Sequence, residues 1–115
     1  MTRIRVSSPA LRTMDGITFA SRAEMNRYAT LKILERMGRI KDLELQPTYV
    51  LQPAYIRDGR KVQPLKYRAD FRYLDTRDNR IIVEDVKGHV TDVYSLKRKI
   101  LLYKYPELNF VEVKA

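Results

Sequence analysis

The sequence contains no cysteine, no tryptophan and a single histidine, His89. Disulfides, a cysteine nucleophile and a thiolate zinc site are therefore excluded, and one histidine cannot build a histidine metal cluster. No uninterrupted apolar run is long enough to cross a membrane, and the first 14 residues lack the apolar core of a signal peptide. The sequence also has no low-complexity segment and no internal repeat. We expect a cytoplasmic protein with one domain.

Positive charge is what the chain has in excess. It carries 23 Lys and Arg against 14 Asp and Glu, which gives a net charge of +9 over 115 residues. A small domain this basic favours a polyanionic partner, of which nucleic acid is the most common. Because the basic residues are spread along the chain, we expect a basic surface on a folded domain rather than a basic tail.

Turn residues and hydrophobic periodicity predict the elements. Residues 1–14 show no clear period and are predicted to be a flexible basic arm, followed by a single domain over residues 15–115. One helix is predicted over residues 21–38, because Ser21 can cap it and Gly38 can end it. A second helix is predicted over about residues 92–104, with an apolar stripe of Val93, Leu96, Ile100 and Tyr103. The predicted strands are residues 43–56, 61–75, 81–87 and 109–113.

The order of these elements is helix, three strands, helix, strand. Tight turns, including Asp58-Gly59, join the first three strands, so these strands should pair antiparallel. The strand–helix–strand end of the chain implies a right-handed crossover and a parallel pair. We therefore expect an α/β protein (an α+β mixed sheet) with a mixed four-stranded sheet and one helix on each face. Within residues 61–75, alternation predicts that Tyr67, Ala69, Phe71 and Tyr73 share one face.

Charged residues stand where this sheet should be most buried, in the stretch "VEDVKGH" at residues 83–89. Strand alternation places Asp85 and Lys87 on one face and Glu84 on the other. Asp70, on the preceding strand, can come within reach of the same point. Glu24 shares the apolar stripe of the first helix and should point inward to this region.

Carboxylates and water are the ligands that Mg²⁺ prefers, and Mn²⁺ can use the same oxygen ligands. A metal so held can assist phosphodiester hydrolysis, and a lysine beside it can orient water and neutralise charge on the phosphate. The sequence thus predicts a metal site of Asp70, Asp85 and Glu24, with Lys87 as a catalytic residue. Glu84 stays a second possible ligand if its strand is bulged.

The same residues resemble the PD-(D/E)XK nuclease superfamily, through Glu24, Asp70 and "DVK" at residues 85–87. The stretches "DGITFASRAEMNRYATLKIL", "YRADFRYLD" and "VEDVKGHVTDVYSLKRKILLYKYP" are similar to small phage-encoded endonucleases and Holliday-junction-resolvase-like proteins. The proline of the superfamily motif is Ala69 here. The resemblance implies a restriction-endonuclease-like αβββαβ core and a Mg²⁺- or Mn²⁺-dependent endodeoxyribonuclease that acts in the host cytoplasm. It implies DNA, branched or linear, as the partner, and it allows a homodimer, since resolvases act as two-fold dimers.

Each of these residues also has a structural interpretation. Glu24 can be a capping-box residue only, Asp70 an ordinary cross-strand ion-pair partner, and Asp85–Lys87 a surface pair. The candidate nucleic-acid contacts can equally be solvated side chains or, for His89, a turn residue; these contacts are Lys97, Arg68, Lys99 and His89. The alternative function is a non-catalytic nucleic-acid-binding module of a phage recombination or packaging assembly. A pure protein-interaction domain is a third interpretation.

Overall fold

The computed structural model describes residues 7–115. The predicted arm over residues 1–14 falls partly outside this range. Residues 9–14 are ordered, which corrects the prediction for that part: Pro9–Arg12 form a 3-10 helix (η1) and Thr13–Met14 a short strand (β1). The Arg12 guanidinium donates hydrogen bonds to the carbonyls of Ser7 and Phe19, which ties this segment to the domain.

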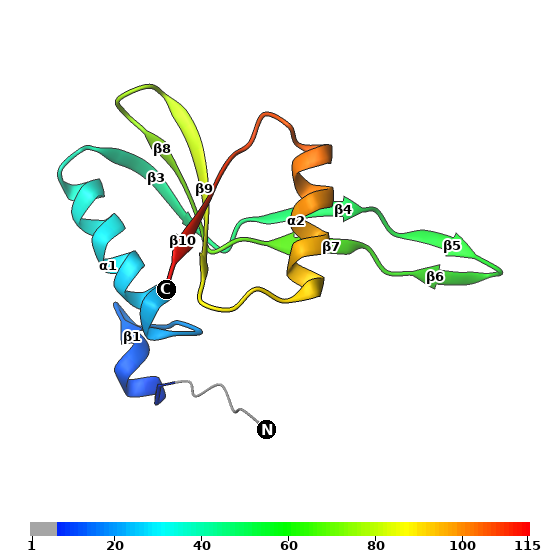
Figure 1. The fold of residues 1–115 in the computed structure, drawn as a ribbon, viewed down its shortest axis with the longest axis horizontal. Helices are drawn as coiled ribbons and strands as arrows, with labels where there is room; N and C mark the ends of the chain where they lie inside the picture. The colour runs from blue at the N-terminus through cyan, green and yellow to red at the C-terminus, as the bar shows by residue number, and fades with distance from the viewer. Residues whose placement is uncertain (1–6) are drawn as a thin grey trace.

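A mixed four-stranded sheet forms the centre of the molecule, as predicted (Figure 1). Its strand order is β10-β9-β8-β3; β3 pairs with β8 and β8 with β9 antiparallel, and β9 pairs with β10 parallel. The helix between β9 and β10 makes the expected crossover. The bounds are α1 Arg22–Arg36, β3 Ile40–Leu45, β8 Phe71–Asp75, β9 Arg80–Lys87, α2 Asp92–Lys104 and β10 Asn109–Lys114, with β1 paired to β2 Ile17–Thr18.

The helix ends follow the sequence signals. The Ser21 hydroxyl accepts a hydrogen bond from the Glu24 amide at 3.1 Å, and the Thr91 hydroxyl accepts one from the Tyr94 amide at 3.1 Å. Gly38 adopts φ +75°, the left-handed conformation that glycine reaches without strain, and so ends α1. These caps fix where each helix starts, and hence where Glu24 enters the core.

The sheet separates two hydrophobic clusters, one under each helix. Tyr28 and Leu31 of α1 pack on Phe71 and Tyr73, whereas Tyr94 and Leu101 of α2 pack with Tyr67, Ala69 and Val83. The predicted common face of Tyr67, Ala69, Phe71 and Tyr73 is therefore wrong, although all four are buried. The strand breaks between Arg68 and Phe71, and this break transfers the buried side from α2 to α1.

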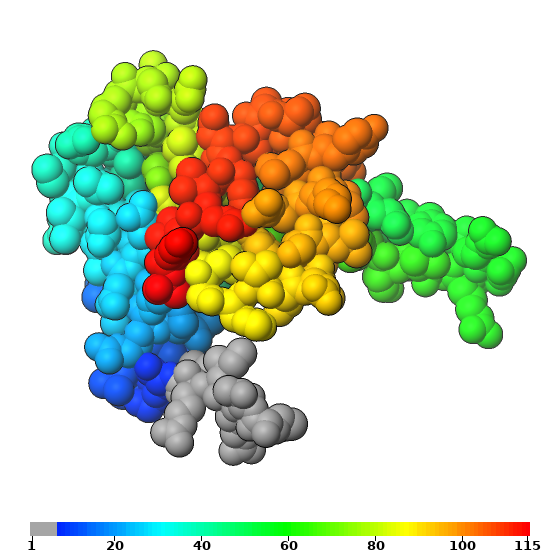
Figure 2. Space-filling model, viewed as in Figure 1, coloured from blue at the N-terminus to red at the C-terminus, as the bar shows by residue number. Residues whose placement is uncertain are grey.

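The predicted strands 43–56 and 61–75 are likewise interrupted, and their middle parts leave the sheet. Residues 48–68, which we call the ribbon, form an antiparallel hairpin whose base packs against α2 and whose outer half projects from the body in Figures 1 and 2. Its strands are β4 Thr48–Gln52, β5 Tyr55–Arg57, β6 Arg60–Val62 and β7 Leu65–Arg68. Prolines at 47, 53 and 64 stand at the breaks, because proline cannot donate to a strand ladder. The radius of gyration is 16.3 Å, against roughly 13 Å for a compact chain of this length.

The apolar stripe predicted for the second helix is wrong for three of its four residues, and only Ile100 packs against the core. Tyr94 and Leu101 face the sheet, while Val93, Leu96 and Tyr103 are exposed. The pattern of apolar residues did not predict that Tyr94 is buried, with its ring in the core and its hydroxyl hydrogen-bonded. Over residues 7–115, neither helix combines the length and apolar character that a membrane crossing requires.

Candidate functional site

Two adjacent carboxylates, Glu84 and Asp85, are buried on opposite faces of β9. Their exposed fractions are 1% and 2%, so each has been removed from water almost completely. A buried charge is costly unless it is paired and hydrogen-bonded. The partners of these two side chains therefore decide what each can do.

Glu84 faces α1 and is fully paired. The Arg27 guanidinium forms a bidentate pair with it, with Nε–Oε1 at 2.7 Å and Nη2–Oε2 at 2.6 Å, and the Tyr73 hydroxyl donates to Oε2. Burial, followed by the hydrogen bond to Glu84, raises the pKa of Tyr73, so the phenol stays protonated as the donor. Since β9 carries no bulge beside Glu84, this residue does not join the Asp85 face as a second ligand.

Asp85 faces α2 and is only half satisfied. Its Oδ2 accepts a hydrogen bond from the Tyr67 hydroxyl. The Lys87 ammonium lies 3.0 Å from Oδ1, but at an angle that makes no hydrogen bond, so this buried oxygen has no hydrogen-bond partner among residues 7–115. A buried carboxylate oxygen left open in this way is a place for an additional cation or donor.

Asp70 forms hydrogen bonds with the backbone of both neighbours of Asp85 in β9. Its amide donates to the Glu84 carbonyl at 3.0 Å, and its Oδ2 accepts from the Val86 amide at 2.6 Å. Burial, and then the nearby charges of Glu24 and Asp85, raise the pKa of Asp70 to about 7, against the opposing hydrogen bond from Val86. Burial is the largest cause of the rise, the two neighbouring carboxylates add to it, and the charge of Lys87 reduces it.

Glu24 is buried at the first turn of α1, as predicted from the stripe it shares with Tyr28 and Leu31. Burial, then the charge of Asp85, raise the pKa of Glu24, while Lys87 lowers it. Within the described residues its carboxylate does not return a hydrogen bond to the Ser21 amide. The capping box is thus only half formed, and the Glu24 side chain is turned to the Asp85–Lys87 region instead.

Lys87 contacts Asp85 and is partly exposed to solvent. Its ammonium lies 4.2 Å from the centre of the Tyr94 ring, a cation–π distance, as well as 3.0 Å from Asp85. Together with Glu24, Asp70 and His89 it lines a cleft of about 520 Å³ at the end of the sheet. The structure therefore brings Glu24, Asp70, Asp85 and Lys87 to one region, as the sequence predicted, with His89 at its rim.

A metal ion fits the donor set of this region in part. Three carboxylates gather there, one carries an unpartnered buried oxygen, and two have raised pKa values. Oxygen donors of this kind suit Mg²⁺ or Mn²⁺. In the conformation shown by residues 7–115, however, no three side chains of His, Asp or Glu already stand at mutual distances that would hold a metal ion. Side-chain rotation or bound water would have to complete the site.

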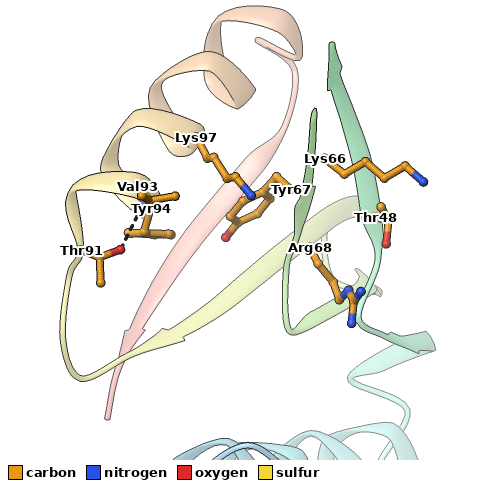
Figure 3. Close-up of a pocket in the computed structure, with 8 residues that line it drawn as sticks. All are labelled: Thr48, Lys66, Tyr67, Arg68, Thr91, Val93, Tyr94 and Lys97. Atoms are coloured by element: carbon orange, nitrogen blue, oxygen red, sulfur yellow. Dashed lines mark hydrogen bonds between the residues drawn. The ribbon is translucent and has the colours of Figure 1, made fainter. Parts of the chain in front are cut away.

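A second cleft, of about 490 Å³, lies between α2 and β7 (Figure 3). Its wall includes Tyr67 and Tyr94, the two phenols that contact the Asp85–Lys87 pair. Its charged side chains are Lys66, Arg68 and Lys97, with no acid among its lining residues. Figure 3 shows Lys97 extending from α2 toward Tyr67. We call it the basic cleft; its positive side chains lie on the side of Tyr67 and Tyr94, the residues that contact Asp85 and Lys87.

The predicted nucleic-acid contacts are thus divided. Arg68 and Lys97 line the basic cleft, and His89 lines the cleft that contains Glu24 and Asp70. Lys99 is exposed on α2 and lines neither cleft. Sequence reasoning gave no site role to Tyr67, Tyr94 or Lys66. The alternation that marked Tyr67 as buried was the signal for it, because a buried tyrosine needs a hydrogen-bond partner for its hydroxyl.

Glu112 was also missed. It stands beside Asp85 in the β9–β10 register, and it accepts hydrogen bonds from Tyr94 and Arg98, which lower its pKa. Those two donors occupy Glu112, so the open carboxylate on this face is Asp85.

The fold and this site define a basic α+β domain with a cluster of carboxylates and one lysine at the end of a mixed sheet. The family described as "Protein of unknown function (DUF1064)" matches residues 10–115, and the chain belongs to this family. Comparison with curated proteins and with solved structures gives no match. The likeness to PD-(D/E)XK nucleases therefore rests on the residues of this chain alone.

Proposed function

We propose that this chain is a metal-dependent DNA endonuclease of the PD-(D/E)XK kind, selective for DNA structure in the manner of Holliday-junction resolvases. One observation supports it above the others. Asp85 is buried beside Asp70, Glu24 and Lys87, and its Oδ1 has an ion pair with Lys87 but no hydrogen-bond donor among residues 7–115. Glu84, by contrast, has a hydrogen-bond donor on each of its two oxygens.

In this proposal Asp70, Asp85 and Glu24 hold one or two Mg²⁺ or Mn²⁺ ions. Such an ion supplies Lewis acidity and lowers the pKa of bound water. Hydrolysis forms a bond from a water oxygen to phosphorus and breaks the bond from phosphorus to the leaving 3′ oxygen. Lys87, partly exposed and free to turn from Asp85 into the cleft, orients the water or offsets the negative charge that develops on the phosphate.

A second candidate function is nucleic-acid binding without cleavage, as an accessory module of a phage recombination or packaging assembly. The observation that favours it is the lack, over residues 7–115, of three acidic or histidine side chains already placed for a metal ion. The net charge of +9 supports both functions equally. Cleavage, not binding, separates them.

The test is cleavage of a labelled panel: a four-way junction, a flap, nicked and linear duplex, and single strands, each with Mg²⁺ or Mn²⁺. We expect metal-dependent cutting that falls by at least about 100-fold in Asp85→Asn and in Lys87→Ala. The matched control for the first variant is Asp42→Asn, an exposed acid whose positive φ asparagine tolerates; it should cut as the wild type does. Salt-sensitive binding that persists in EDTA, with no cutting of any substrate, would transfer the assignment to the accessory module.

A further inference from the structure

The ribbon carries positive charges that make no ion pairs with the body of the domain among the described residues. Residues 48–68 contain five basic side chains and one acidic one. The basic residues of the ribbon are Arg57, Arg60, Lys61, Lys66 and Arg68. All five are exposed, and none of them pairs with an acid of the body among the described residues.

The tip of the ribbon places like charges face to face. Arg57 is directly opposite Arg60 in the β5–β6 register, an arrangement that destabilises a strand pair. The nearest acid, Asp58, lies 3.7 Å from Arg57, and both of these side chains are largely exposed. A pair at that exposure contributes little. A bound polyanion would offset the repulsion between Arg57 and Arg60.

Apolar side chains at the tip are also without a partner. Ile56 is 75% exposed and Tyr55 is 47% exposed, and neither contributes to the two hydrophobic clusters. The β5–β6 hairpin contacts itself rather than the body. Cations beside an exposed isoleucine and tyrosine match a nucleic-acid groove, where phosphates flank the apolar parts of bases.

The dimensions and position of the ribbon match as well. Ten residues from Thr48 to Arg57 extend about 30 Å at the rise of a β-strand, close to one turn of B-form DNA. The major groove of B-form DNA admits a two-stranded β-ribbon, whereas that of A-form RNA is deep and narrow. At its base, β7 contributes Lys66 and Arg68 to the basic cleft and ends two residues before Asp70. A duplex held by the ribbon would therefore continue over that cleft.

We propose that the ribbon is a second nucleic-acid-binding element, which places its tip in the major groove of B-form duplex DNA beside the basic cleft. In the β5–β6 register Ile56 is opposite Lys61, so these two side chains share the face that enters the groove, with Ile56 against base edges and Lys61 at the phosphates beside them. Arg57 and Arg60 share the other face, next to the turn, where they contact phosphates. This assignment does not depend on cleavage, so it goes beyond the proposed nuclease function. It assigns a binding role to residues far from the acids.

The test measures fluorescence anisotropy of a labelled 30-bp duplex DNA in EDTA between 50 and 200 mM salt. The variant is Arg57→Gln/Arg60→Gln/Lys61→Gln, and its control is Arg36→Gln/Arg39→Gln/Lys41→Gln, which removes three exposed positive charges from the end of α1 and β3. We expect the ribbon variant to bind at least 10-fold more weakly. Its slope of log K against log salt should be smaller by about 2–3, at about 0.9 per lost phosphate contact. The control should change affinity by less than about threefold.

Ile56→Ser separates groove contact from charge. It should weaken binding severalfold with an unchanged salt slope, and wild type should bind duplex RNA of the same sequence less tightly. Equal losses in the two triple variants, or equal binding of DNA and RNA, would overturn the proposal. So would a change of oligomeric state in Ile56→Ser with DNA binding unchanged, because the ribbon would then contact a second copy. Failure of the nuclease proposal is read separately, from cleavage with metal.

Discussion

Glu84 and Asp85 are neighbours in sequence, equally buried, and on the same strand, yet their surroundings differ completely. Glu84 receives two hydrogen bonds from Arg27 and one from Tyr73, which satisfies a buried carboxylate. Asp85 receives one hydrogen bond, from Tyr67, and its other oxygen has no hydrogen-bond donor among residues 7–115. Glu84 thus has hydrogen-bond donors on both oxygens, whereas the second oxygen of Asp85 has only the ion pair with Lys87.

The difference separates a structural charge from a functional one. A buried ion pair costs stability when one partner is removed, because the other charge is left unpaired. Asp85 has one hydrogen bond and one ion pair, and Lys87, which is 28% exposed, can turn to solvent, so removing the charge of Asp85 should cost less. Stability measurements can therefore distinguish the two roles without any assay of activity.

The largest expected stability effect is at Glu84. Glu84→Gln should lower the free energy of unfolding by about 2–3 kcal/mol, because Arg27 loses its counter-charge while Tyr73 keeps an acceptor. The value lies below that for a fully buried pair, since the Arg27 side chain is 28% exposed and can turn to solvent. Asp85→Asn, the matched variant, should change stability by less than about 1 kcal/mol. Urea unfolding followed by circular dichroism measures both.

A loss at Asp85→Asn as large as that at Glu84→Gln would contradict this comparison. It would mean that the Tyr67–Asp85–Lys87 contacts are a structural network. The main support for the proposed metal site would then be removed.

Asp70 sharpens the comparison through pH. Its pKa of about 7 in the folded state exceeds the ordinary 3.8, so the folded state binds the proton more tightly. Its contribution is therefore fully present below about pH 4 and is lost as pH rises through about 7. Asp70→Asn keeps an acceptor for the Val86 amide and removes that loss. At pH 8 it should be more stable than wild type by on the order of 1–2 kcal/mol, less than the whole shift implies because Asp70 keeps some solvent contact.

Divalent cations provide the control for this variant. Mg²⁺ or Mn²⁺ should raise the melting temperature of the wild type at pH 8, because a ligand that binds only the folded state stabilises it. Asp70→Asn should show little of this rise. Equal stabilisation of both proteins by the cation would place its binding elsewhere, and an unchanged pH profile in the variant would contradict the role given to Asp70.

The sequence predicted the αβββαβ order, the caps and the pairing of the sheet, because these depend on local turn residues and on period. It did not predict the ribbon. A hairpin that extends a sheet and one that leaves it have the same prolines and the same alternation in sequence. Which of the two forms depends on packing against α2, and the sequence pattern does not show that packing. For the same reason Tyr67 and Phe71 were assigned to one face, although the break at residues 69–70 sends them to opposite sides of the sheet.

In the candidate site, strand alternation was enough to place Asp85 with Lys87 and Glu84 on the other face. It could not show that Arg27, 57 residues away in sequence, neutralises Glu84, because such pairing depends on the tertiary fold. Glu24 remained undecided between cap and site, since both use the same position at the start of α1.

A last pair of variants tests Glu24. Ser21→Ala should cost about 1 kcal/mol, the usual value for a lost N-cap hydrogen bond, because the Glu24 amide loses its acceptor. Glu24→Gln should cost less than about 0.5 kcal/mol or stabilise slightly, because burial and Asp85 already raise the pKa of Glu24 and so disfavour its charge. Thermal unfolding at pH 7 measures both. A cost at Glu24 equal to that at Ser21 would mean that the carboxylate completes a capping box in solution, and the site would then rest on Asp70, Asp85 and Lys87 alone.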